Sequence, residues 1–461
     1  MNDMTTKRRS PRARLSSLMN DARTFDLLAI CLLFFGFAGQ GIRNIVGFNG
    51  SGVVMVVLFV PFVGAFIASG ASILKRPQPV TTLLYVLVCA LSTAWSVYPI
   101  RTATTALVTM GITATGLMIA AARPLDRFID LLIRSFQSVL VVSYAFELFV
   151  SLIWRSEFAP IPMLMDAQIP KLYYWSNNAL FHGGPIQGFM GNRNPLAFVA
   201  LLLIISLAVR WAAERRRTAS TLLWIGLSIL TLALTRSGTV TVALVVCALA
   251  GLAFILVAAV PERARPGVVF SLVGLAMVAT AFAVAAHEHV TSLLGKSPDL
   301  TGRADIWRAL IPMWRERPIL GWGWTIGYPT ELPVFAHFIP REDGSPTTQA
   351  HNAYIEALFL TGVLGAVLVT LAVLTLLIGT CLHAVQRIDA DRLRVAPAIL
   401  TVALVVQSTV ESRLLYEGNW MLFVVLAAYL AVDRPFHEHW AKRRLRSEQR
   451  SPADFDTLRK A

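Results

Sequence analysis

Long apolar runs dominate this chain of 461 residues. They recur between residues 25 and 433, and each run of about 17 to 25 residues is long enough to cross the hydrocarbon core of a bilayer as an α-helix. Helices are expected because that core offers no water to an exposed backbone. The chain is 56% hydrophobic and only 15% charged, against about 25% charged residues in a soluble domain. The sequence therefore predicts an all-α polytopic membrane protein.

Twelve segments qualify as membrane-spanning helices. Their predicted ranges are 25–42, 52–74, 80–97, 102–122, 128–153, 195–213, 219–235, 238–260, 267–287, 353–383, 395–411 and 419–433. A basic stretch precedes the first segment, as in a signal peptide. Because no small-residue cleavage site follows, a retained helix is expected there instead.

These segments define one transmembrane domain, residues 25–433, between a basic N-terminal tail (1–24) and a basic C-terminal tail (434–461). With the N-terminus in the cytoplasm, 27 of the 41 lysines and arginines fall in cytoplasmic connections or tails, which is the bias that sets orientation. Both termini are predicted to be cytoplasmic. The net charge of +14 then reflects topology and attraction to membrane lipid, and no nucleic-acid partner is predicted.

Two large outer loops follow from this topology, at residues 154–194 and 288–352. The first loop contains Tyr173, Tyr174 and Trp175 beside several amides. Aromatic faces with amides suit sugar binding, whereas Trp and Tyr also gather at membrane interfaces, and both interpretations stay open. Glu147, inside the fifth segment, is expected to face a cavity or to be protonated, because a charge there costs about 2.5–3.5 kcal/mol.

No metal site is predicted. The four cysteines lie in apolar segments without the spacing of metal ligands; they are Cys31, Cys89, Cys247 and Cys381. His287 and His289 flank Glu288, but residues two apart point to different sides of a helix.

The second outer loop carries a short polar signature that begins at Gly302-Arg303. Asp299 or Thr301 is a candidate cap for a helix through Trp314. Its apolar stripe is expected at Trp307, Leu310, Ile311 and Trp314. An arginine in the first turn opposes the helix dipole, which is tolerable where an anion binds. The alternative is a surface Arg303 paired with Asp305 or Glu316.

His351 and Asn352 end this loop at the mouth of the next span. An imidazole with an ordinary pKa of about 6.5 is well suited to take a proton from a sugar hydroxyl; a simple interface residue is the alternative. Thr347 or Thr348 is the expected helix cap. No relay between His351 and Glu356 is predicted, since the two do not share a helix face.

Several motifs occur in a fixed order along the chain. They are Leu91–Pro99, Gly191–Asn194, Gly302–Trp307, Arg317–Gly323, His351-Asn352 and Glu411-Ser412. In this order and topology, over roughly residues 80–430, the chain resembles the O-antigen ligase and exopolysaccharide polymerase family of bacterial membrane proteins. The resemblance implies a bacterial inner-membrane enzyme that transfers a glycan from a polyprenyl diphosphate at the outer face, with no metal or other cofactor.

The resemblance also implies roles for particular residues. The family's loop arginine and histidine fall on Arg303 and His351, which makes these two the candidate catalytic residues. A further basic residue of the family would stand where this chain has Gly238, so Arg236 is at best a displaced substitute. The other candidate substrate-binding residues are Arg193, Asn352, Trp307 and Glu411. Pairing of Glu411 with Arg413 is the alternative for that glutamate.

Leu91–Pro99 and Glu411-Ser412 look most like the polymerase branch of the family, with a ligase as the alternative. A lipid-linked glycan flippase is the candidate from another class, although the two halves show no repeat of the kind transporters carry. A structural scaffold of an export complex is a third alternative. The expected partners are the polyprenyl-linked oligosaccharide, membrane lipid, and chain-length regulator and export proteins.

Overall fold

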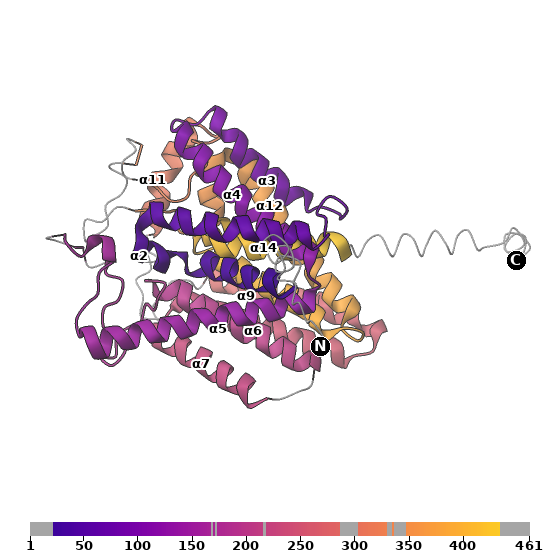
Figure 1. Cartoon of the computed structure of the whole chain (residues 1–461). Helices are drawn as coiled ribbons and strands as arrows, with labels where there is room; N and C mark the ends of the chain where they lie inside the picture. The colour runs from indigo at the N-terminus through magenta and orange to yellow at the C-terminus, as the bar shows by residue number, and fades with distance from the viewer. Residues whose placement is uncertain are drawn as a thin grey trace, which may run out of the picture.

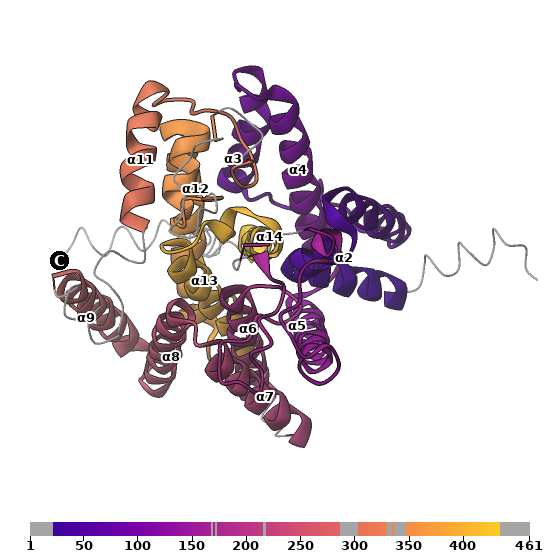
Figure 2. The same ribbon diagram turned by 90° about the vertical axis from the view of Figure 1, so that its left-hand side faces the viewer.

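The computed structural model describes residues 22–166, 169–170, 173–214, 218–285, 303–329, 334–335 and 347–433. In these ranges the chain is built from helices, and its one β-type pairing is an isolated bridge between Phe158 and Ser176. The long helices lie side by side (Figure 1), and seen from the end of the bundle they surround α14 (Glu417–Asp433) (Figure 2). The prediction of an all-α protein is confirmed.

Each predicted span overlaps a helix. The helices concerned are α2 (Ala22–Ala68), α3 (Val80–Leu91), α4 (Pro99–Ala122), α5 (Leu125–Phe149), α6 (Arg193–Glu214), α7 (Ala219–Thr235), α8 (Gly238–Ala259), α9 (Arg265–Ala285), α12 (Ala353–Arg387), α13 (Val395–Ser408) and α14. Six helices of the described chain are long and apolar enough to cross a bilayer, namely α2, α4, α5 with the turn that follows it, α6, α8 and α12. The chain is therefore a multi-pass membrane protein, while the count of twelve spans stays a prediction.

The first two predicted spans both lie in α2, which is broken at Gly47, where φ is +72°. This helix crosses α14 at very close range: a Cβ on Gly36 would lie 3.0 Å from the Cα of Gly418. Small residues permit such an approach between membrane helices, where packing rather than the hydrophobic effect drives association. Most of α14 is buried as a result, so the last predicted span lies at the centre of the bundle.

A break in α12 gives a docking site to the segment 317–324. At Gly362 φ is +67°, and the helix loses its regular hydrogen bonds there. The free carbonyls of Phe359 and Leu360 accept hydrogen bonds from Trp322 N at 3.2 Å and Gly323 N at 2.9 Å. Broken helices are tolerated in membranes where other protein groups satisfy the backbone in this way.

The motif 91–99 lies on the other side of the same segment. The Trp95 indole N–H donates to the Leu320 carbonyl at 2.9 Å, and the Tyr98 hydroxyl donates to the Gly323 carbonyl at 2.9 Å. Arg317 contacts the Trp322 ring face, 5.0 Å from its centroid. Two of the motifs noted in the sequence therefore pack on one another and on the break in α12, which gives them a structural role.

Replacing Gly362 by alanine is expected to destabilise the protein strongly. A Cβ there would lie 2.1 Å from the Ile319 carbonyl oxygen, and the positive φ adds strain. We expect a loss of about 2–6 kcal/mol, from about 1–3 for backbone strain and about 1–3 for overpacking. Thermal unfolding in detergent measures it. Gly226→Ala is the control, because nothing lies within 4 Å of that position; equal melting of the two variants would contradict the assignment.

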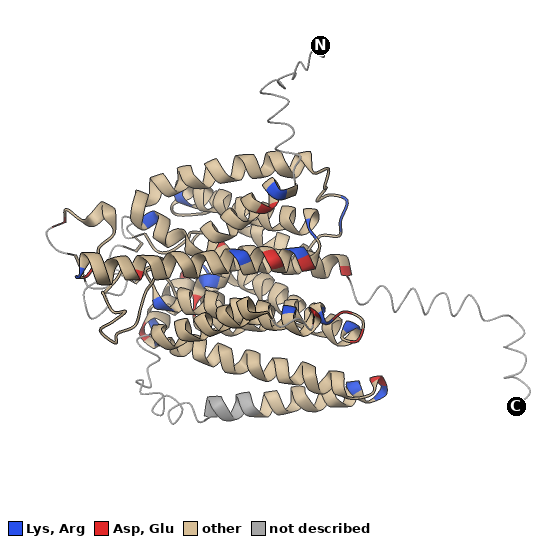
Figure 3. Cartoon of the chain, turned by 60° about the horizontal axis from the view of Figure 1, so that its bottom comes forward, with Lys and Arg blue, Asp and Glu red and all other residues tan. Residues whose placement is uncertain are grey.

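Charged residues of the described chain lie mostly toward the two ends of the helices, with long uncharged stretches between them (Figure 3). One end holds ion pairs such as Arg123 with Asp26, 2.6 Å apart. The opposite end holds Arg303, His351 and Glu411. Such a separation is expected of helices that cross a bilayer, because charge is costly at its centre.

Candidate functional site

Glu411 is the centre of the polar cluster at this end of the bundle. It lies in the turn between α13 and the short helix η7 (Ser412–Leu415), and it is only 3% exposed. Its Oε1 accepts hydrogen bonds from Arg303 Nη2 at 3.3 Å and from Asn194 Nδ2 at 3.2 Å. Its Oε2 lies 3.0 Å from His351 Nδ1. One buried carboxylate thus contacts residues from three other parts of the chain.

The contact with Glu411 sets the protonation of the imidazole of His351. A carboxylate only accepts hydrogen bonds, so His351 Nδ1 carries the proton and Nε2 presents a lone pair. Within the described residues Nε2 has no hydrogen-bond partner, and the side chain is 21% exposed. The arrangement is that of a histidine oriented by a carboxylate and able to accept a proton.

Backbone geometry supports a functional role for His351. Its φ is +51°, in the left-handed region, which non-glycine residues adopt at some cost and which is frequent at functional sites. Asn352 follows as the N-cap of α12 and accepts from Tyr354 N and Ile355 N. The predicted caps Thr347 and Thr348 are therefore wrong. The Asn352 amide also donates to the Thr409 carbonyl, so both of its polar atoms are engaged in holding the turn.

Arg303 is the first residue of α11 (Arg303–Glu316), which packs on α12. It pairs with Glu411, so the predicted alternative of a surface arginine paired with Asp305 or Glu316 is wrong. Asp305 instead pairs with Arg308 at 2.6 Å. The candidate caps Asp299 and Thr301 lie outside the described residues.

The apolar face of α11 differs in part from the prediction. Ile306 and Leu310 are buried, whereas Ile311 is exposed, so the expected stripe is displaced by one position at its start. Trp307 is half-buried and donates its indole N–H to the Ala350 carbonyl at 2.9 Å. It therefore holds the backbone directly before His351.

Arg193 and Arg236 flank the cluster without joining it. Both are exposed, and neither forms an ion pair or side-chain hydrogen bond with another described residue. Their neighbours connect them to it: Ser237 Oγ donates to Asn194 Oδ1 at 2.8 Å, and Asn194 in turn contacts Glu411. Arg236 has a φ of +48°. Both guanidinium groups are thus available to a ligand at the margin of the cluster.

Residues 221–370 match the family model described as O-antigen ligase. The chain therefore carries an O-antigen ligase-like domain. The match runs from α7 into α12 and includes Arg236, Arg303, Trp307 and His351. Glu411 and Asn194 lie outside it, so the fold completes the cluster with residues that flank the O-antigen ligase-like domain on both sides. No curated protein matches the chain.

Arg413 is a residue of the cluster that the sequence did not single out for it. The predicted pairing with Glu411 is wrong, because Glu411 pairs with Arg303 and His351, and Arg413 forms no ion pair with any described residue. Burial lowers the pKa of Arg413, against the opposing effect of the nearby carboxylates of Glu411 and Glu417. Arg413 is half-buried, and a guanidinium without an anionic partner can bind the oxygens of an anionic substrate, which makes it a candidate for that role.

Glu356 forms a second, fully buried carboxylate site beneath the first. The hydroxyls of Tyr328, Ser412 and Tyr416 donate to it at 2.7–3.0 Å, and Ala350 N donates to it at 2.5 Å. Ser412 also accepts from Asn352 N at 3.2 Å. Through Ala350 and Ser412, Glu356 fixes the segments before His351 and after Glu411 relative to each other.

The loop 154–194 is anchored by Glu147. This carboxylate is fully buried and accepts from Ser176 Oγ, Gln187 N and Gly188 N at 2.7–3.0 Å. Its surroundings are therefore loop backbone and a hydroxyl. Trp175 is 3% exposed and stacks on Phe146, so neither the membrane-interface nor the sugar-binding interpretation holds for it. Tyr173 and Tyr174 carry no such contact to the core.

Proposed function

We propose that this O-antigen ligase-type membrane enzyme is a glycosyltransferase that polymerises repeat units of a cell-surface polysaccharide from a polyprenyl-diphosphate donor. The observation that carries the proposal is the pairing of one buried carboxylate, Glu411, with both His351 and Arg303. A base and a cation held about one carboxylate are what the attack of a hydroxyl on a phosphorylated sugar requires.

His351 is the proposed general base. The acceptor hydroxyl gives its proton to Nε2 while its oxygen attacks the anomeric carbon, and the bond from that carbon to the diphosphate oxygen breaks. Glu411 keeps Nδ1 protonated and stabilises the imidazolium that forms, as a buried carboxylate does beside a catalytic histidine. The diphosphate leaves on the polyprenyl carrier.

Guanidinium groups hold the diphosphate in this proposal. Arg303 has donors left beyond its single bond to Glu411, and Arg193, Arg236 and Arg413 have no described ion-pair partner. Planar guanidinium forks match phosphate oxygens and stabilise the charge that develops on the leaving group. Arg236 supplies the positive charge that the glycine at position 238 does not.

The membrane arrangement fits the proposal. We place the end of the bundle that bears Glu411 at the outer face and the opposite end, with both termini, in the cytoplasm, across twelve spans of a bacterial inner membrane. The polyprenyl chain lies against the exposed apolar surfaces of the helices. Transfer onto another repeat unit is favoured over transfer to lipid A-core by the Leu91–Pro99 and Glu411-Ser412 motifs; a flippase is the alternative of another class.

Arg303→Ala tests the proposal in the native cell, with Arg308→Ala as its control. Arg308 lies on the same helix but is exposed and pairs with Asp305. We expect Arg303→Ala to lower transfer about 10²–10³-fold, as does removal of one donor to a developing oxyanion, with protein level unchanged. Glycan length and lipid linkage are the readouts.

The products distinguish the alternatives. Single repeat units on the carrier at the outer face support a polymerase, whereas full-length glycan on the carrier supports a ligase. Units trapped at the inner face point to the flippase. A normal glycan in Arg303→Ala cells would show that the arginine is structural.

A further inference from the structure

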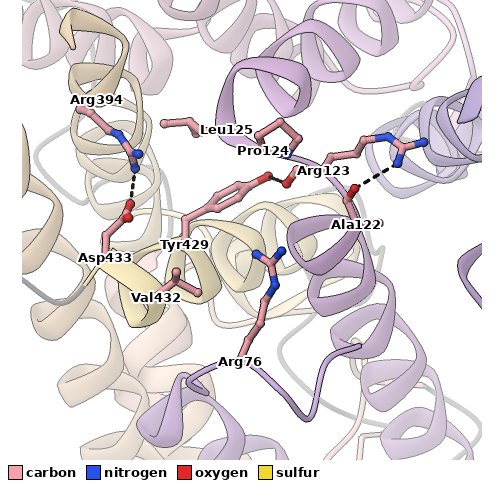
Figure 4. Close-up of a pocket in the computed structure, with 9 residues that line it drawn as sticks. All are labelled: Arg76, Ala122, Arg123, Pro124, Leu125, Arg394, Tyr429, Val432 and Asp433. Atoms are coloured by element: carbon pink, nitrogen blue, oxygen red, sulfur yellow. Dashed lines mark hydrogen bonds and ion pairs between the residues drawn. The ribbon is translucent and has the colours of Figure 1, made fainter. Parts of the chain in front are cut away.

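A cavity of about 270 Å³ lies at the end of the bundle opposite to Glu411. Its walls come from the connection between α2 and α3, the turn between α4 and α5, the short helix η6 (Arg392–Arg394) and the end of α14. Figure 4 shows the lining side chains, which are Arg76, Ala122, Arg123, Pro124, Leu125, Arg394, Tyr429, Val432 and Asp433. The cavity shares no residue with the candidate site.

Three of the lining side chains are arginines, and two of them form ion pairs with carboxylates. Arg123 donates to Asp26 at 2.6 Å, and its guanidinium points out of the cavity (Figure 4). Arg394 pairs with Asp433 inside the cavity and with Asp391 outside it. Arg76 donates to the Ala120 carbonyl at 3.3 Å and has no carboxylate partner among the described residues. Among the described residues, Arg76 is therefore the lining arginine without an ion-pair partner.

The surroundings of Arg76 are fixed in place. Gln78 Nε2 donates to the carbonyls of Ile73 at 2.7 Å and Arg76 at 2.8 Å, which holds the connection in a defined turn. The Tyr429 hydroxyl donates to the Arg123 carbonyl at 2.9 Å. An anion in the cavity would meet a preorganised guanidinium, which lowers the entropic cost of binding.

The apolar neighbours of Arg76 indicate where the anion comes from. Leu74, two residues away, is 93% exposed, and Val432 in the cavity wall is 44% exposed. Exposed leucine and valine beside cations are typical of a surface that contacts lipid, and basic pockets between membrane helices bind lipid headgroups. These apolar side chains would not contribute to the binding of inorganic phosphate, which has no apolar part.

We propose that this cavity binds a phosphate group through Arg76, and that the phosphate is the headgroup of an anionic phospholipid of the adjacent leaflet. The guanidinium donates to the phosphate oxygens, and the acyl chains extend over Leu74 and Val432. Bound lipid then ties the α2–α3 connection to the ends of α4 and α14.

The test uses the full-length protein in nanodiscs of phosphatidylcholine with a minor fraction of phosphatidylglycerol. Native mass spectrometry counts the phosphatidylglycerol molecules that stay bound when the protein is released from the nanodisc. We expect Arg76→Ala to retain it about tenfold less well, the effect of losing one charge-assisted hydrogen bond. Lys75→Ala is the matched control, since this neighbouring cation does not line the cavity; it should retain lipid as the wild type does.

Thermal unfolding in lipid-free detergent checks both variants, and no change is expected because both side chains are exposed. Equal lipid retention by Arg76→Ala and the wild type would overturn the proposal. In a separate experiment, the wild-type protein is titrated with inorganic phosphate alone. Stabilisation of the wild type by phosphate, without retention of phosphatidylglycerol, would overturn the assignment to lipid.

Discussion

His351→Asn is expected to lower glycan transfer by about 10²–10⁴-fold, the contribution of a well-placed general base. Asparagine is the informative substitution, because His351 has a φ of +51° and asparagine tolerates that conformation better than most residues. The backbone is therefore kept while the imidazole is removed, and an amide cannot accept the hydroxyl proton. The measurement is the glycan length and the amount of unreacted lipid-linked repeat unit in the native cell.

His182→Asn is the control for this change. His182 is also an exposed-loop histidine whose Nδ1 contacts a described oxygen, the Asn178 carbonyl at 2.9 Å, but it lies in the loop 154–194. Full transfer is expected from it. If His351→Asn cells make glycan of normal length at a normal protein level, His351 is not the base, and the choice of this end of the bundle as the reaction site loses its main support.

The fold was predictable from the sequence where it depends on the length of the apolar segments. Each predicted span overlaps a helix, because a run such as 238–260 has only one way to satisfy its backbone in lipid. The break at Gly47 falls in the connection predicted between the first two spans, whereas the break at Gly362, inside the predicted span 353–383, was not predicted. A glycine inside an apolar run is predicted as helix, and the break at Gly362 depends on hydrogen bonds exchanged with residues 318–323, about forty positions away.

Local sequence patterns also failed to predict the N-cap of α12, where one residue was a candidate for two roles. The sequence favoured Thr347 or Thr348 as the cap of α12, yet Asn352 is the cap. Asn352, a predicted substrate-binding residue, is also of a type strongly preferred as an N-cap. Both polar atoms of its amide contact the protein, which fixes the turn that follows His351.

The contacts within the candidate site could not be predicted either, because its residues lie far apart in the sequence. Arg303, His351 and Glu411 were each singled out, partly through a family resemblance, but nothing in the sequence joins them. Glu411 lies 108 positions from Arg303 and 217 from Asn194. Contacts of this kind depend on how helices pack, and local periodicity carries no information on them. A local pair of Arg413 with Glu411 was one alternative for the same reason, since residues close in sequence are the natural candidates for a contact.

Glu411→Gln provides the sharpest test of the cluster itself. Burial alone would raise the pKa of Glu411, but the hydrogen bond from His351, with the charges of His351, Arg413 and Arg303, outweighs it and holds the pKa below its ordinary value. The carboxylate is therefore ionised at neutral pH. Glutamine removes the charge that stabilises the imidazolium, and its NH₂ group faces the hydrogen-bond donors of the cluster without being able to accept from them. We expect transfer to fall by about 10²–10⁴-fold, as in other histidine–carboxylate pairs.

Glu417→Gln is the matched control, because Glu417 lies close by and forms an ion pair with Arg43 at 2.6 Å, outside the cluster. It should transfer glycan at the wild-type rate. Retention of wild-type transfer by Glu411→Gln would show that His351 and Arg303 act without a shared carboxylate.

The pH dependence of stability gives this substitution a second, independent readout. A lowered pKa in the folded state means that ionised Glu411 stabilises the fold fully above the unfolded-state pKa of about 4.3, and that this stabilisation disappears as the pH falls through the lowered folded-state pKa. The glutamine variant should therefore melt below the wild type at neutral pH, because Arg303 loses a buried partner. The gap between the two melting temperatures should close as the pH is lowered past that point. A gap that stays constant from neutral to acid pH would mean that Glu411 is not charged in the folded protein.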